Sequence, residues 1–210
     1  MMKEELCKNK INKQYFDNLK ISLYIIILII VDQISKYFVF LNLKGHKPYS
    51  LLKNIFELNY LENRSAAFGI DPITFLHKIF NFKYFNEHPN AFVTAKFIFF
   101  VIFTIVVVSL VLYIVFKMTA SNFKYKFFRF SLLLIASGAV GNFIDRVFRK
   151  YVIDFLYFKL INFPIFNIAD IYITIGAILM CYIIIFVFDE NDLNTLMSNI
   201  KQKKTNKNDK

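Results

Sequence analysis

The chain has 210 residues, of which 57% are hydrophobic, and a formal net charge of +11 with only five Gly and four Pro. This length suits one domain, and the apolar residues gather in runs long enough to cross a bilayer. The composition therefore excludes a water-soluble globular protein and a low-complexity linker. The basic residues lie between the apolar runs and at both ends, which favours membrane lipids as partners over nucleic acid.

Four apolar runs predict four membrane-spanning helices. A basic leader before the first run is also typical of a secretory signal peptide, but no small-residue cleavage site follows it, so we expect a retained helix. Each run is long enough at 1.5 Å per residue to cross the hydrocarbon core. The predicted domain covers residues 1–188, and its spans are residues 19–41, 91–116, 127–148 and 168–188.

The segments outside the spans differ in character. In the outward loop 42–90, the stretch IFELNYLENRSAAFGI alternates and predicts one or two short strands followed by a turn. Its small residues form a patch where backbone can approach a ligand closely. Residues 71–90 look like an added surface or interfacial element. Residues 189–210 are polar and Lys-rich, and we expect a disordered cytoplasmic tail.

An even number of spans places both chain ends on one side of the membrane. Both ends and the connection 117–129 are basic, so the positive-inside rule predicts that this side is cytoplasmic. The loops 42–90 and 149–167 then face outward. However, the second of these loops carries Arg149, Lys150 and Lys159, which weakens the charge asymmetry.

One charged pair lies inside the first span. Asp32 and Lys36 are four residues apart, on one helix face, and we expect them to form an inward-facing structural ion pair. The alternative is that they mark the end of the span near the interface. The two cysteines and three histidines have no metal-ligand spacing, so no metal site and no disulfide are predicted.

Three aspartates near the ends of the last two spans are the candidate functional residues. Asp145 ends the third span, Asp154 lies in the following loop, and Asp170 begins the fourth span. A carboxylate in a membrane segment costs roughly 2.5–3.5 kcal/mol, which makes each a candidate functional residue. Two carboxylates brought together share one proton, so one can activate water while the other polarises a peptide carbonyl. This is the chemistry of an aspartic protease.

The neighbours of each aspartate indicate which two work together. Asp145 is followed by Arg146, and a carboxylate beside a guanidinium suits a structural or orienting role. Asp170 stands near a helix N-terminus, where the macrodipole favours an anion, and Asn167 can cap that helix. Asp154 has no charged neighbour in the sequence. Asp154 and Asp170 are therefore the predicted pair.

Three other interpretations of these carboxylates stay open from the residues alone. They can be structural caps or snorkelling groups. They can also form the proton relay of an ion or lipid transporter, although such proteins have inverted repeats or broken helices in matching halves, and neither is visible here. A membrane scaffold is the third interpretation, but it has no need of both aspartate segments.

Over residues 19–188 the chain resembles bacterial lipoprotein signal peptidase, also called signal peptidase II. The resemblance implies an all-α membrane protein with four transmembrane helices and a small extracytoplasmic β-cradle, located in the cell inner membrane. The motifs that carry it are VDQISK (Asp32, Lys36), ENRSAAFG (Asn63 to Gly69), GAVGNFIDR (Asn142, Asp145, Arg146), VIDF (Asp154) and FNIAD (Asn167, Asp170).

The resemblance also implies a function. Members of this family are aspartic endopeptidases that remove the signal peptide from diacylglyceryl-modified prolipoproteins, cutting before the lipidated cysteine, and a monomer without a cofactor is expected. The implied catalytic pair is Asp154 and Asp170, the same pair that the neighbouring residues favour. Substrate-binding or supporting roles are implied for Asp32, Lys36, Asn63, Asn142, Asp145, Arg146 and Asn167.

The sequence departs from the family pattern at a few positions. Ser65 stands where the family usually has Gly, and Ile171 stands where a small polar residue often follows the last aspartate. The 71–90 element is an addition, and we expect it to act as a lid or a membrane-surface contact.

Overall fold

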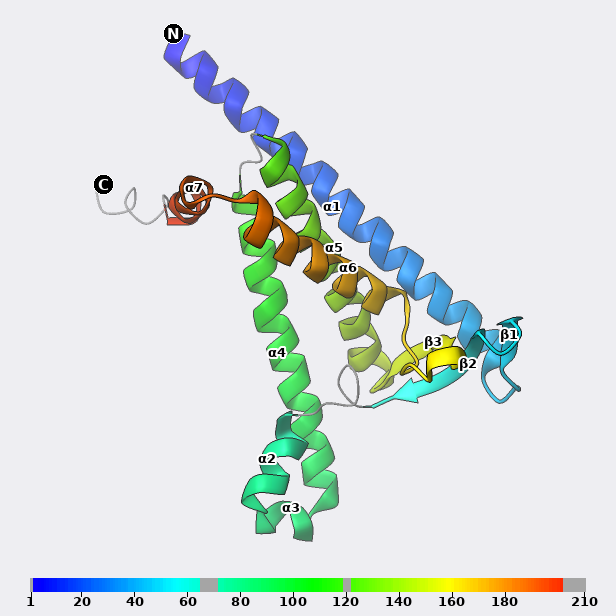
Figure 1. The fold of residues 1–210 in the computed structure, drawn as a ribbon. Helices are drawn as coiled ribbons and strands as arrows, with labels where there is room; N and C mark the ends of the chain where they lie inside the picture. The colour runs from blue at the N-terminus through cyan, green and yellow to red at the C-terminus, as the bar shows by residue number, and fades with distance from the viewer. Residues whose placement is uncertain (1, 65–71, 119–121, 202–210) are drawn as a thin grey trace.

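The computed structural model describes residues 2–64, 72–118 and 122–201, and it is mostly helical with a small sheet at one end (Figure 1). Four helices are long and apolar enough to cross a membrane, which confirms the predicted fold class. The last of them continues into one π-helical segment, η3 (Ile183–Val187). The four helices are α1 (Met2–Leu43), α4 (Pro89–Lys117), α5 (Phe123–Arg149) and α6 (Ile168–Tyr182).

Helix α5 is the central helix of the bundle. It is the most buried of the four candidate spans, and small residues let its backbone approach α6. A Cβ on Gly138 of α5 would lie 2.3 Å from the Ala169 carbonyl oxygen, and one on Gly176 of α6 would lie 2.7 Å from that of Ser131. Glycine is therefore required at these contacts.

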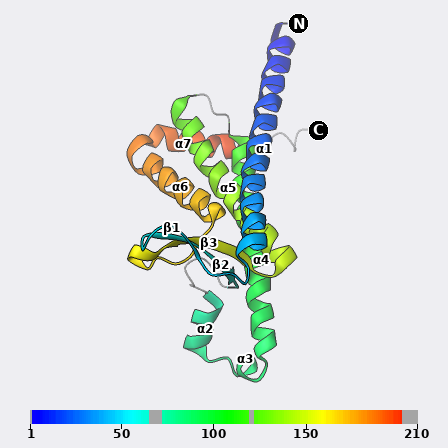
Figure 2. The same cartoon turned by 90° about the vertical axis from the view of Figure 1, so that its right-hand side faces the viewer.

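A three-stranded antiparallel sheet lies at one end of the bundle (Figure 2). Its strands are β1 (Tyr49–Leu52), β2 (Phe56–Asn63) and β3 (Val152–Phe158), in the order β1-β2-β3. Strand β2 lies in the stretch 55–70 and confirms a strand there, whereas β1 lies before that stretch and was not predicted. In β2 and β3, Leu61 is opposite Asp154.

The third strand corrects the prediction that Asp154 lies in a loop. The connection between α5 and α6 contains β3, followed by the short 3-10 helix η2 (Lys159–Ile161). Val152, Ile153 and Phe155 are all buried, so both faces of the strand are covered and the sequence shows no clear alternation. Pairing with β2 satisfies its backbone groups.

Two short helices, α2 (Pro72–Phe80) and α3 (Lys83–Glu87), lie beyond the sheet at the start of α4 (Figure 1). They form the added surface element that the sequence predicts. His77 of α2 packs on the rings of Phe82 and Phe92, with centroids 6.3 and 4.9 Å away. The small-residue patch Ser65, Ala66, Ala67 and Gly69 lies outside the described residues.

The prediction of a disordered tail is wrong for its first part. Helix α7 (Glu190–Lys201) lies at the end of the bundle opposite the sheet (Figure 1). Leu193 and Leu196 have helical spacing, and Leu196 packs against the bundle core. Asp192 forms an ion pair of 2.7 Å with Lys124 of α5. These contacts stabilise α7, although the average polarity of the tail gives no sign of them.

Candidate active site

A cavity of about 540 Å³ lies between α4, α5, α6 and β3. Five polar side chains line its part nearest the sheet, and apolar side chains of α4 and α6 line most of the rest. The polar residues are Asn63, Asn142, Arg146, Asp154 and Asp170. The cavity therefore has a charged part beside the sheet and an apolar part between membrane helices.

Asp154 is held by two side-chain amides. Its side chain is on β3 and the residue is only 1% exposed. Its Oδ2 accepts a hydrogen bond of 2.8 Å from Nδ2 of Asn63, and its Oδ1 accepts one of 2.6 Å from Nδ2 of Asn167. Burial raises the pKa of Asp154 to about 6, the negative charge of Asp170 adds to this shift, and the two amide donors oppose it.

Asp170 lies in the first turn of α6 and takes part in a capping box. The backbone N–H of Asn167 donates to Oδ2 of Asp170 at 3.1 Å, and the backbone N–H of Asp170 donates to Oδ1 of Asn167 at 3.0 Å. Its other oxygen, Oδ1, accepts from Nδ2 of Asn142 at 2.8 Å. Both oxygens of Asp170 are thus held in place by N–H donors at the start of α6.

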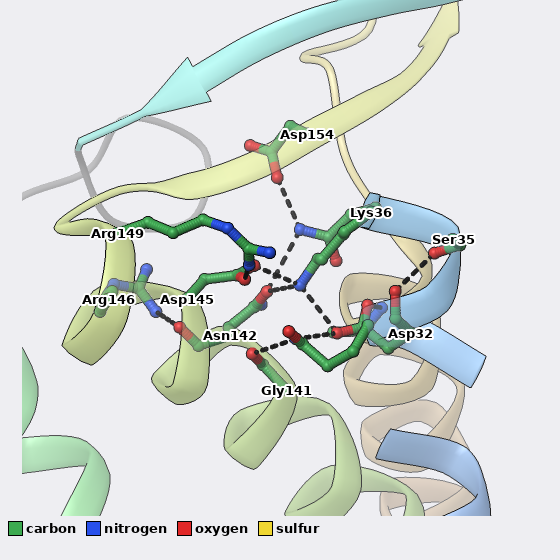
Figure 3. A network of polar contacts seen from close by, with 12 residues as sticks. Asp32, Ser35, Lys36, Gly141, Asn142, Asp145, Arg146, Arg149 and Asp154 are labelled. Atoms are coloured by element: carbon green, nitrogen blue, oxygen red, sulfur yellow. Dashed lines mark hydrogen bonds and ion pairs between the residues drawn. The ribbon is translucent and has the colours of Figure 1, made fainter. Parts of the chain in front are cut away.

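The two asparagines also orient each other. Nδ2 of Asn167 donates to Oδ1 of Asn142 at 3.2 Å, and so does Nζ of Lys36, at 2.9 Å (Figure 3). Because the oxygen of Asn142 faces two donors, its NH2 group must face Asp170. Lys36 of α1 and the N-cap of α6, Asn167, thus orient the amide of Asn142 that holds this carboxylate.

The predicted inward-facing ion pair in α1 is present and is part of a larger buried cluster. Nζ of Lys36 lies 2.8 Å from Oδ2 of Asp32 and 2.8 Å from Oδ2 of Asp145, and all three side chains are fully buried (Figure 3). Oδ1 of Asp32 accepts a hydrogen bond of 3.0 Å from the backbone N–H of Ala169. The cluster thereby ties α1 and α5 to the first turn of α6.

The predicted partner of Asp145 is wrong. Its guanidinium partner is Arg149, one helical turn later, and not the adjacent Arg146. Adjacent helical residues point in different directions, whereas residues four apart share a face, so the spacing of Asp145 and Arg149 was the available signal. Arg146 instead lines the cavity, with its Cζ 5.7 Å from the ring centroid of Phe100.

Sequence reasoning also missed Gly141, whose role depends on the assembled site. A Cβ there would lie 2.5 Å from Oδ2 of Asp32, so only glycine leaves room for the buried ion pair. Of the other positions considered, Ile171 lines the cavity, and Ser65 lies outside the described residues. Within the described parts of the chain, no group of three His, Cys, Asp or Glu side chains could hold a metal ion.

Comparisons with known proteins identify the family of the chain. The family model described as signal peptidase (SPase) II matches residues 24–186. Lipoprotein signal peptidase of Caldanaerobacter subterraneus subsp. tengcongensis is 34% identical over 76% of this chain and 91% of its own length. The enzyme of that name from Streptococcus thermophilus is 37% identical over 76% of this chain and 88% of its own.

Solved structures show the same fold. One bacterial membrane enzyme has a TM-score of 0.56 and 27% identity, over 89% of this chain and 92% of its own. A second has a TM-score of 0.59 and 28% identity, over 80% of this chain and 94% of its own. The chain is thus a bacterial membrane protein that belongs to the signal peptidase II family, the aspartic lipoprotein signal peptidases that remove the signal peptide from prolipoproteins.

Proposed function

We propose that Asp154 and Asp170 are the catalytic residues and that the chain cleaves diacylglyceryl-modified prolipoproteins directly before the lipidated cysteine. One observation carries this proposal: two carboxylates from different elements line one cavity, each held by its own set of amide donors. Such a pair shares a proton and supplies both an acid and a base.

The surroundings of the two carboxylates favour different roles. Asp170, which lines the cavity and is oriented by two N–H donors, is suited to take a proton from the attacking water. Asp154, whose pKa is raised to about 6, is suited to hold the proton. In that form it donates a hydrogen bond to the scissile carbonyl and then protonates the departing amine.

The charge of the whole cluster supports one shared proton. The cluster holds four carboxylates and three cations: Asp32, Asp145, Asp154, Asp170, Lys36, Arg146 and Arg149. Net charge is costly in a membrane protein interior. One proton on the catalytic pair makes the cluster neutral, which is the protonation state that aspartic catalysis requires.

The remaining residues of the site have supporting roles in this proposal. Asn63, Asn142 and Asn167 orient the two carboxylates through the amide contacts described above. Asp32, Lys36 and Asp145 hold α1, α5 and α6 together beneath the pair. Arg146 lines the cavity, where it can bind a peptide carbonyl of the substrate.

We further propose that the chain ends are cytoplasmic and the active site is near the outer face of the inner membrane. The start of α1 and helix α7 both lie at the end of the bundle away from the sheet (Figure 1). Basic residues are enriched at that end, which is typical of the cytoplasmic side. The signal helix would enter between the spans while the acyl chains stay in the bilayer.

The catalytic assignment is tested with purified protein in detergent and lipid, using a diacylglyceryl-modified preprotein. Asp154→Asn and Asp170→Asn keep the shape of the side chain and remove its charge, and each should lower the cleavage rate by roughly a thousandfold. Asp189→Asn, an exposed aspartate at the opposite end, is the matched control and should cleave at the native rate. Near-native cleavage by either site variant would show that the pair is wrong, and Asp145 would be tested next.

A further inference from the structure

Two threonines are the polar side chains of the apolar part of the cavity. Thr104 of α4 lies in a stripe with Phe100, Phe103 and Val107, all of which line the cavity. Thr174 of α6 also lines it, four residues after Asp170 and so on the same face of the helix. Apart from the active-site residues, all other described lining residues are apolar.

Within the described residues the hydroxyl groups of these two threonines make no hydrogen bond, and neither does Ser109, which lies outside the cavity, whereas the other Ser and Thr hydroxyls of the membrane helices do. A Ser or Thr in a helix commonly donates to the carbonyl of the preceding turn. Ser22 donates to Asn18 at 3.1 Å, and Thr94 donates to Asn90 at 2.9 Å. In the part of the chain that the structure describes, Thr104 and Thr174 make no such bond.

Thr104 is half-buried and Thr174 is exposed, and in a membrane helix such side chains face lipid rather than water. An unpartnered hydroxyl in apolar surroundings is unfavourable, and two that line one cavity are suited to a ligand that supplies acceptors there. Most peptide carbonyls of a signal helix are bonded within that helix, and the free ones at its end belong beside the scissile bond, where Asp154 and Arg146 are available to them. The ester carbonyls of a diacylglyceryl group are different, since the group contains acceptors and no donor. Thr174 lies roughly 6 Å along the axis from Asp170, within reach of esters linked through the substrate cysteine.

We propose that Thr104 and Thr174 hydrogen-bond the ester carbonyls of the substrate's diacylglyceryl group and so position the lipidated cysteine beside Asp154 and Asp170. This inference rests on the proposed function. In this arrangement one helix supplies both Asp170 and Thr174, so the spacing between the catalytic carboxylate and the lipid contact is fixed by α6 itself. The threonines are positioning residues, because they touch the lipid and not the scissile bond.

The experiment pairs a change in the enzyme with a change in the substrate. Thr104→Val and Thr174→Val keep the side-chain shape and remove the hydroxyl. The substrates are one preprotein carrying either a diacylglyceryl group or its dialkyl ether analogue, which has no ester carbonyl. We expect each variant to lower kcat/KM about three- to tenfold on the ester substrate. The native enzyme should have a lower kcat/KM on the ether substrate than on the ester substrate. On the ether substrate, the variants and the native enzyme should have the same kcat/KM.

Thr94→Val is the matched control, because its hydroxyl is already bonded within α4, and it should act like the native enzyme on both substrates. Equal losses on ester and ether substrates would overturn the inference, since the partner would then be a peptide carbonyl or the effect would be one of packing. Unchanged kcat/KM on the ester substrate would overturn it as well. Cleavage of the ester substrate by the native enzyme tests the proposed function separately.

Discussion

The buried carboxylate of Asp154 makes the stability of the fold depend on pH. Its pKa is about 6 in the folded chain, against 3.8 for an exposed aspartate, chiefly because of burial. Since the folded pKa is the higher one, the native state binds the proton more tightly than the unfolded state. The stabilisation is fully present below about pH 4 and is lost as the pH rises through about 6.

Asp154→Asn removes this loss because an amide never ionises. Above pH 7 the variant should be more stable than the native chain by about 1–3 kcal/mol, and below pH 4 the two should be alike. Thermal unfolding in detergent at pH 4 and pH 8 measures the difference. Asp189→Asn serves as the control and should follow the native profile. If Asp154→Asn also follows it, the carboxylate is not destabilised by burial.

At the same scale, the sequence allows some residues of the site to be placed and not others. Asp32 and Lys36 are four apart in one helix, so their ion pair follows from local geometry. The contact between Asn63 and Asp154 spans 91 positions and depends on the pairing of β2 with β3. No local pattern reveals such a contact, and the resemblance to a family was needed to bring Asn63 into the site.

At the scale of elements, the close packing of α5 on α6 sets the position of Asp170. Gly138→Ala would place a methyl group 2.3 Å from the Ala169 carbonyl oxygen, and backbone cannot move aside as a flexible side chain does. We expect a loss of about 2–3 kcal/mol in stability from overpacking and at least a roughly tenfold loss of cleavage. Unfolding and kcat measured on the same preparation separate the two effects.

Gly45→Ala is a matched comparison, because a Cβ at Gly45 meets nothing within 4 Å although its φ is +78°. It should cost only about 1 kcal/mol and leave kcat unchanged. If Gly138→Ala were as mild as Gly45→Ala, the interface between α5 and α6 would be more adaptable than its backbone spacing implies.

The elements themselves were predictable where hydrophobic length decides the structure. The four spans follow from uninterrupted apolar runs, and strand β2 follows from the alternation of residues 55–70, whereas β1 lies before that stretch. Strand β3 was not predicted because both of its faces are covered at Asp154, so its sequence does not alternate. Helix α7 was not predicted because its few apolar residues lie in a polar, Lys-rich segment. Both elements depend on burial against other parts of the fold, and the average composition of a segment does not show such burial.

At the scale of the whole molecule, the structure separates a basic end from a catalytic end. Arg149 at the end of α5, with Lys150 and Lys159 after it, weakens the charge asymmetry that the sequence predicts. In the structure, Arg149 is paired with Asp145, and Lys159 is 2.8 Å from Glu57. Two of the three cations are therefore neutralised locally, which removes an objection to the proposed orientation.

This orientation can be measured with an impermeant thiol reagent in a chain carrying Cys7→Ser and Cys181→Ser. Leu160→Cys introduces a thiol in η2 at a residue that is 70% exposed, and Ser198→Cys introduces one on the exposed face of α7. In right-side-out membrane vesicles, only the thiol at position 160 should react, and in inverted vesicles only the thiol at position 198. The reverse pattern would place the catalytic end in the cytoplasm, where exported prolipoproteins could not reach it from the outer leaflet, and the proposed orientation would be wrong.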